Sequence, residues 1–204
     1  MGIKSFQERI TLVSCDIVEE EVRRTLNGKI AFLRPFFLDP ALHIFPEMLA
    51  EELENALDRF SDSFNSFIIV YGNCHPNIDD LLASYTAKRV KASICVEMML
   101  GKEDYRNELR NVPRTFFLTH GWYKIWRDIF RDQLSVNKKL EKVFFKNYKS
   151  ALFIDVGIAT EKYRSEAKDF SEYFSLQFEE KNTDLIYLRG LLEDALVEIV
   201  NMLH

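Results

Sequence analysis

The chain has 204 residues, an apolar fraction of 47% and a charged fraction of 29%, which are ordinary values for a globular protein. Its net charge of −5 disfavours a general nucleic-acid binder, because neutralising phosphates requires a basic surface. The sequence contains no run of about 18 uncharged apolar residues, so no membrane span is expected. Residues 1–9 lack a secretory core, and the odd cysteine count favours a cytoplasmic location.

The first third of the chain predicts two strands and two helices. An apolar strand is expected at 10–14 and a helix at 16–26, whose first turns carry acidic residues that suit the helix dipole. A second strand is expected at 30–33. The segment 34–45 contains prolines and predicts a loop, and a helix with an apolar stripe begins near Pro46.

The remainder of the chain continues this alternation. Residues 67–71 are almost entirely apolar, which is typical of a central strand buried on both faces. Further strands are expected at 89–91, 115–118, 151–156 and 176–179. Further helices are expected at 76–85, 94–100, 121–132, 137–148, 161–174 and 184–202. The pattern predicts an α/β fold with a mostly parallel sheet and flanking helices, as one domain over 1–204 or as two similar lobes with a seam near 124–149.

All three cysteines lie where a predicted strand ends or the next helix begins. Cys15 closes the first strand, Cys74 follows the strand at 67–71, and Cys95 follows the short strand at 89–91. In an open parallel sheet the carboxyl ends of the strands form one edge, where ligands bind. We therefore expect the three thiols to meet there and to bind a metal ion or an iron–sulfur cluster. The alternative is that the cysteines only fill core space.

Three histidines are candidates for a fourth ligand, and one of them, His75 beside Pro76, has the alternative interpretation of a residue at a helix N-terminus. His43 lies in the predicted loop before Pro46, and His120 follows the strand at 115–118. Three cysteines and one histidine suit structural zinc, whereas an open fourth position suits an iron–sulfur cluster or a catalytic zinc. His120 has an alternative interpretation as a packing or capping residue.

Two further positions are candidates for cofactor binding. Tyr71 and Gly72 stand at a sharp strand-to-helix junction, where glycine permits close approach of a ligand to the backbone. Asp155 ends the last clear strand and either reaches the same edge or caps a turn. The sequence contains no phosphate loop, no dinucleotide fingerprint and no nucleophile elbow.

Several short motifs, in order and spacing, resemble a prokaryotic family, domain-of-unknown-function family 1638. They include Cys15, His43, residues 71–74, Cys95, residues 115–122 and residues 152–157. The resemblance extends from about Ile10 to Leu192. His120 stands where the family tends to have proline, whereas the three cysteines and His43 are retained. The resemblance implies a role in anaerobic one-carbon metabolism, because members often lie beside genes for corrinoid-dependent methyl transfer.

Three functions follow from these observations. The first is a zinc or iron–sulfur protein of corrinoid methyl transfer, with Cys15, Cys74 and Cys95 as ligands and His43 or His120 as the fourth. The second is an adaptor or chaperone that binds a corrinoid protein or methyltransferase without chemistry of its own. The third is a metal-free enzyme with one cysteine nucleophile and a histidine base.

Overall fold

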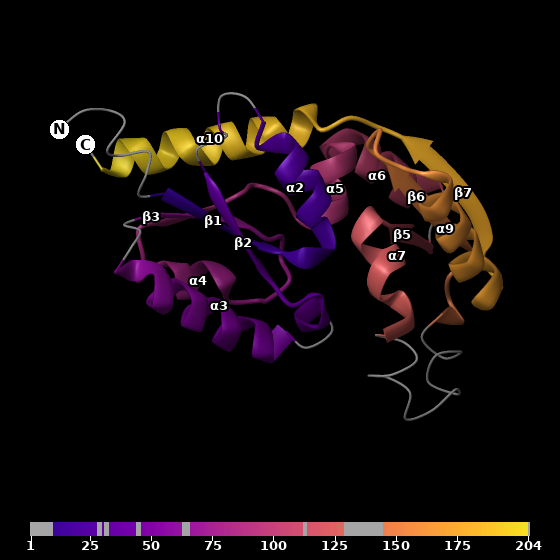
Figure 1. Ribbon diagram of the computed structural model, residues 1–204, viewed down its shortest axis with the longest axis horizontal. Coiled ribbons are helices and arrows are strands. Elements are labelled where there is room, and N and C mark those ends of the chain that lie inside the picture. The colour runs from indigo at the N-terminus through magenta and orange to yellow at the C-terminus, as the bar shows by residue number, and fades with distance from the viewer. Residues whose placement is uncertain are drawn as a thin grey trace. The chain divides into compact units, whose positions relative to one another are not determined.

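The chain divides into two compact units in the computed structural model (Figure 1). Unit 1 comprises Met1–Met98 and Ile186–His204, and unit 2 comprises Met99–Leu185. The structure describes residues 10–27, 30, 33–43, 46–62, 66–111, 114–128 and 145–203. Each unit is built on its own parallel sheet, so the predicted α/β class is confirmed. The prediction of a single domain with a seam near 124–149 stays a prediction.

Unit 1 contains a four-stranded parallel sheet in the order β2-β1-β3-β4. Its strands are β1 Ile10–Cys15, β2 Arg34–Leu38, β3 Ser66–Val70 and β4 Ala87–Arg89. Every residue of the central strands β1 and β3 is buried, because helices cover both faces of the sheet. This burial explains the continuous apolar runs that the sequence shows there.

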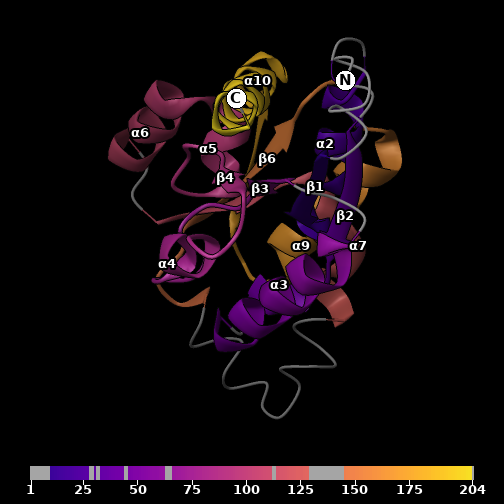
Figure 2. The same ribbon diagram turned by 90° about the vertical axis from the view of Figure 1, so that its left-hand side faces the viewer.

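Helices cover this sheet on two sides (Figures 1 and 2). They are η1 Asp16–Val18, α2 Glu19–Thr25, η2 Pro40–His43, α3 Pro46–Ser61, α4 Ile78–Leu82, α5 Cys95–Leu100 and α10 Ile186–Met202. Helices α3 and α4 lie on one face, and α2 and α10 lie on the other. Helix α10 packs on β3 and β4 through buried leucines, although it follows the whole of unit 2 in sequence.

Unit 2 contains a three-stranded parallel sheet in the order β5-β6-β7. Its strands are β5 Thr115–Leu118, β6 Ser150–Asp155 and β7 Gln177–Asn182. Its principal described helices are α6 Lys102–Asn111, α7 His120–Arg127 and α9 Glu161–Tyr173. Side chains alternate across β5: Phe116 stacks on Phe170 of α9 at 5.2 Å, and Phe117 contacts Tyr105 of α6. Helices α6 and α9 therefore cover opposite faces.

The predicted elements differ from the structure at strand β2 and at helix α6. Strand β2 lies at Arg34–Leu38, where a loop was expected, and the two described residues of the strand expected at 30–33, Ile30 and Leu33, are not in a strand. Pro35 is tolerated there because β2 is an edge strand. Helix α6 was not predicted, because it is polar apart from Tyr105 and Leu109. The helix expected at 137–148 lies largely outside the described residues.

Candidate functional site

The carboxyl edge of the unit 1 sheet is the first candidate site. Strands β1 and β3 are neighbours, but the chain leaves β1 for β2 on one side and leaves β3 for β4 on the other. Ligands of open α/β sheets bind at such a change of direction, outside the carboxyl ends of the two strands. Cys15 ends β1, and Tyr71 directly follows β3. Both residues therefore stand at the position that the topology favours.

Gly72 allows the loops after β3 and β4 to touch. A Cβ atom at Gly72 would lie 2.5 Å from Ile94 Cα and closer still to the Ser93 carbonyl oxygen. The neighbouring Asn73 N–H donates a hydrogen bond of 2.6 Å to that same oxygen. The close approach predicted for Gly72 is thus made by the chain's own backbone. This contact brings the loops that carry Cys74 and Cys95 together.

The first two thiols are held in the neutral form. Burial raises the pKa of Cys15 to about 12, and the neighbouring Cys74 and Asp16 groups add to this effect. Burial also raises the pKa of Cys74, although the Gly72 backbone and the Arg89 guanidinium oppose it. A neutral thiol is a poor nucleophile. These directions disfavour the enzyme with a cysteine nucleophile.

The Cys95 thiol also has a raised pKa and interacts with the other two cysteines. Burial raises the pKa of its thiol, and Cys74, Cys15 and the Glu21 carboxylate raise it further. The three thiols therefore lie close enough to act on one another electrostatically. Their raised pKa values keep all three thiols protonated at neutral pH.

The prediction of a zinc or iron–sulfur site built from these cysteines is wrong. Among the described residues, no group of three or more His, Cys, Asp and Glu side chains could hold a metal ion. Neighbouring strands lie about 4.8 Å apart, so the ends of β1, β3 and β4 spread over roughly 10 Å. Thiolate ligands must each lie about 2.3 Å from a zinc ion. The metal-based role in corrinoid methyl transfer is overturned with the site.

The two histidines predicted as fourth ligands belong to different units. The His43 side chain lies outside the described residues, so its role stays a prediction. His120 belongs to unit 2, whereas the three cysteines belong to unit 1.

Tyr71 carries the most informative polar atom at the edge of unit 1. The residue is 3% exposed, and its hydroxyl has no hydrogen-bond partner with suitable geometry among the described residues. Burial raises the pKa of this hydroxyl, the charges of the neighbouring Cys15 and Cys74 thiols raise it further, and a hydrogen-bonding interaction with the Cys15 sulfur adds to this effect. Sulfur is a weak acceptor, so these thiols do not replace a proper partner. A buried hydroxyl without a partner is costly and needs an explanation.

Two glutamates of unit 1 are buried, although neither was predicted as a site residue. Glu21 of α2 is 1% exposed and acts on Cys95, and Glu97 of α5 is 3% exposed. One Glu97 oxygen accepts a hydrogen bond of 3.0 Å from the Ser93 N–H, in the loop that touches Gly72. Glu97 is the lone charged residue in the apolar segment of α5, and this signal could have identified it from sequence.

The carboxyl edge of the unit 2 sheet holds a histidine and an aspartate. His120 Nε2 lies 3.7 Å from Asp155 Oδ1, and the His120 ring packs between Phe153 and Tyr163. Asp155 Oδ1 accepts hydrogen bonds from the backbone N–H groups of residues 157–159. Asp155 therefore caps the turn after β6, as one of its two interpretations predicted. Its cofactor-binding role stays a prediction.

The pKa of Asp155 reflects this cap. Burial opposes ionisation, but the N–H groups of Ala159, Gly157 and Ile158 outweigh it, and His120 adds a smaller effect. The net result is a pKa below the usual range. Arg164 also holds the carboxylate through a 2.9 Å ion pair.

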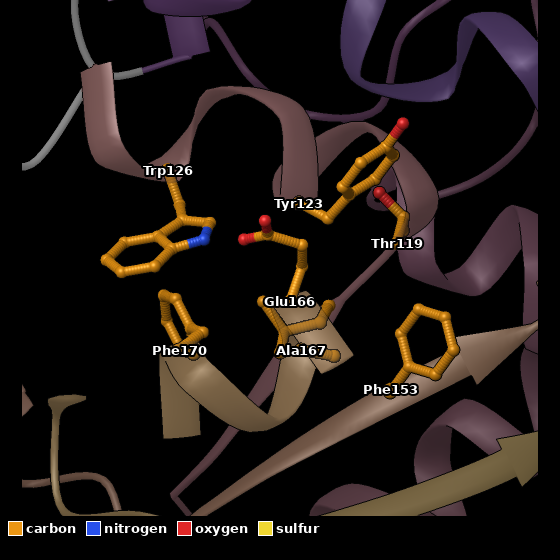
Figure 3. Close-up of a pocket in the computed structure, with 8 residues that line it drawn as sticks. Thr119, Tyr123, Trp126, Phe153, Glu166, Ala167 and Phe170 are labelled. Atoms are coloured by element: carbon orange, nitrogen blue, oxygen red, sulfur yellow. The ribbon is translucent and has the colours of Figure 1, made fainter. Parts of the chain in front are cut away.

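A small cavity lies next to this edge, between α7 and α9 (Figure 3). It is lined by Leu118, Thr119, Tyr123, Trp126, Phe153, Glu166, Ala167 and Phe170. The empty space is about 180 Å³ and has no room for a water molecule. No cysteine lines it. The predicted thiol site and this cavity are therefore separate features.

The fold is that of an α/β protein with two parallel sheets, and the carboxyl edge of each sheet is a candidate binding site. The chain belongs to the family described as proteins of unknown function, DUF1638, whose model matches residues 37–192. The resemblance found in the sequence is thereby confirmed. No curated protein and no solved structure is significantly similar to the chain. No described helix is long and apolar enough to cross a membrane.

Proposed function

We propose that the protein binds a small organic cation, such as an amine or a guanidine, at the carboxyl edge of the unit 1 sheet. The observation that carries this proposal is the buried Tyr71 hydroxyl at the β1/β3 switch point, which has no nitrogen or oxygen hydrogen-bond partner among the described residues and has the weakly accepting Cys15 sulfur as its neighbour. A bound molecule would provide the missing partner. Of the predicted site residues, Cys15 and Cys74 lie close enough to this hydroxyl to raise its pKa.

The charge of the ligand follows from its surroundings. Helix α2 carries acidic residues in its first turn, where an anion would otherwise bind. The buried Glu97 carboxylate lies at this edge, where it accepts a hydrogen bond from the Ser93 N–H. Buried carboxylates gain most from a compensating positive charge. An anionic ligand such as a nucleotide is disfavoured for the same reason.

The neutral thiols suit binding better than covalent chemistry. Cys15, Cys74 and Cys95 offer a polarizable wall against which the apolar part of a ligand packs. Their raised pKa values keep them protonated, so they add no negative charge at neutral pH. The Tyr71 hydroxyl then accepts a hydrogen bond from the ligand's N–H group.

Three probes of equal length test this proposal: n-pentylamine, 1-pentanol and pentanoate. Isothermal titration should show that the amine binds at least about tenfold more tightly than the alcohol, a difference of about 1.4 kcal/mol. Pentanoate should bind most weakly. Crystals soaked with the amine should place its nitrogen within hydrogen-bond distance of the Tyr71 hydroxyl.

Two pairs of variants locate the effect. Glu97→Gln should abolish the preference for the amine over the alcohol, whereas Glu51→Gln, on the exposed side of α3, should not. Tyr71→Phe should weaken amine binding, whereas Tyr85→Phe should leave it unchanged, because Tyr85 precedes β4 and bonds Asp58 instead. Tighter binding of pentanoate than of pentylamine would overturn the proposal.

The predicted cytoplasmic location stays a prediction. So does the predicted partner, a corrinoid protein or methyltransferase.

A further inference from the structure

The indole of Trp126 presents a second buried polar atom without a partner. Trp126 is 2% exposed, and its Nε1 has no hydrogen-bond acceptor among the described residues. Figure 3 shows this nitrogen directed into the cavity between α7 and α9, toward the carboxylate of Glu166. Since the cavity has no room for water in this form, the N–H group is not solvated either. An acceptor is therefore missing at a defined point in unit 2.

The cavity offers complementary chemistry on the opposite side. Glu166 provides an anionic acceptor, and its side chain is 24% exposed. The remaining walls are largely aromatic, with Phe153 and Phe170 from β6 and α9. A donor and an acceptor held between aromatic rings suit a flat molecule that carries an acceptor beside an N–H group. A primary amide or a urea has both groups on one plane.

The ion-pair partner of Glu166 stays paired when Glu166 turns toward such a molecule, because a second carboxylate also contacts this partner. Glu166 forms an ion pair with Arg127, and Arg127 also pairs with Asp169 at 3.3 Å. The Arg127 guanidinium lies 4.3 Å from the centre of the Trp126 ring, which anchors it further. Arg127 therefore keeps two contacts when Glu166 moves. The partly exposed side chains of Glu166 and Tyr123 line the cavity, and a ligand requires their outward rotation to gain space there.

We propose that this cavity is a binding site for a small planar amide or urea group. The Trp126 indole donates a hydrogen bond to the carbonyl oxygen of the ligand, and the Glu166 carboxylate accepts one from its N–H group. The site lies wholly within unit 2 and is independent of the proposed cation site.

Fluorescence of Trp126 tests the proposal directly. The chain has two tryptophans, so Trp122→Phe leaves Trp126 as the only indole reporter. Acetamide should produce a saturable change in its emission, with a dissociation constant in the millimolar range. Acetone, which matches acetamide in shape but lacks the N–H donor, should bind at least tenfold more weakly. Equal binding of the two probes, or the absence of a saturable change, would overturn the proposal.

A matched pair of variants on α9 assigns the acceptor. In the Trp122→Phe background, Glu166→Leu should remove the preference for acetamide over acetone. Glu172→Leu, at an exposed position of the same helix, should preserve it. Acetamide soaked into crystals of the unaltered chain should lie within hydrogen-bond distance of Trp126 Nε1. This measurement does not depend on any variant folding, and acetamide bound elsewhere would contradict the proposed site.

Discussion

Cys15 combines two properties at the residue scale: it ends a central strand, and its thiol is neutral far above neutral pH. Burial raises its pKa from 9.0 to about 12. Below pH 9 the thiol is protonated in both the folded and the unfolded chain. Between about pH 9 and about pH 12, the Cys15 thiol is deprotonated in the unfolded chain but still protonated in the folded one. Deprotonation therefore favours unfolding. The contribution of Cys15 to stability is therefore lost as pH rises from about 9 to about 12.

We expect the free energy of unfolding to fall more steeply with pH in the natural chain than in Cys15→Ser. One proton corresponds to at most about 1.4 kcal/mol for each pH unit. Urea unfolding at several pH values between about 8 and 11 measures both slopes. Parallel slopes would show that the Cys15 thiol has an ordinary pKa in the folded protein.

Gly72 and Gly190 predict opposite effects of the same substitution. Gly72→Ala should lower the free energy of unfolding by about 1–3 kcal/mol, because the new methyl group meets the backbone of Ser93 and Ile94. Gly190→Ala meets open space within helix α10, so it should raise stability by about 0.5–1 kcal/mol. Chemical denaturation of both variants measures whether each change lowers or raises the free energy of unfolding. An unchanged free energy of unfolding in Gly72→Ala would contradict the backbone contact between the loops that carry Cys74 and Cys95.

Individual residues also show how far sequence reasoning reaches into the site. The ends of β1 and β3 were predicted to within one residue. Because the carboxyl ends of parallel strands form one edge of a sheet, this prediction placed Cys15 and Cys74 in one neighbourhood. This relation fixes backbone ends and not the distances between sulfur atoms, which is why the metal prediction was wrong. Trp126 and Glu166 could not be found from sequence, because their patterns match an ordinary apolar face and a solvated charged face.

At the scale of single elements, helix α10 contributes to the stability of the protein mainly through its buried face. The side chain of Leu192 is fully buried, whereas that of Val197 is 57% exposed. We expect Leu192→Ala to cost about 2–5 kcal/mol, because it leaves a cavity. Val197→Ala should change stability by less than about 0.5 kcal/mol. Thermal or urea unfolding compares them, and similar losses in both would contradict the packing of α10.

Elements with a strong periodic pattern were predictable, whereas those defined by neighbours were not. Helix α3 and strand β3 carry clear apolar patterns and begin close to their predicted positions. Strand β2 contains Pro35, which predicts a loop unless the strand is known to lie at an edge. Helix α6 is fixed by contacts such as the 2.6 Å bond of Glu108 to Lys181, which local sequence does not reveal.

At the scale of the whole molecule, two parallel sheets replace the one sheet that alternation alone suggests. The order β2-β1-β3-β4 has a change of direction, whereas β5-β6-β7 proceeds to one side only. Alternating strands and helices predict the class, but they do not reveal where one sheet ends and the next begins. Nor do they reveal that the last helix returns to the first sheet.

This return has a consequence for synthesis on the ribosome. Unit 1 receives α10 only after the 87 residues of unit 2 have been made. At about 5–20 residues per second, the nascent chain spends roughly 4–17 s with the apolar side of β3 and β4 uncovered by α10. Unit 2 has all of its residues before α10 emerges. During this interval nascent unit 1 exposes the surface of β3 and β4 that α10 later covers.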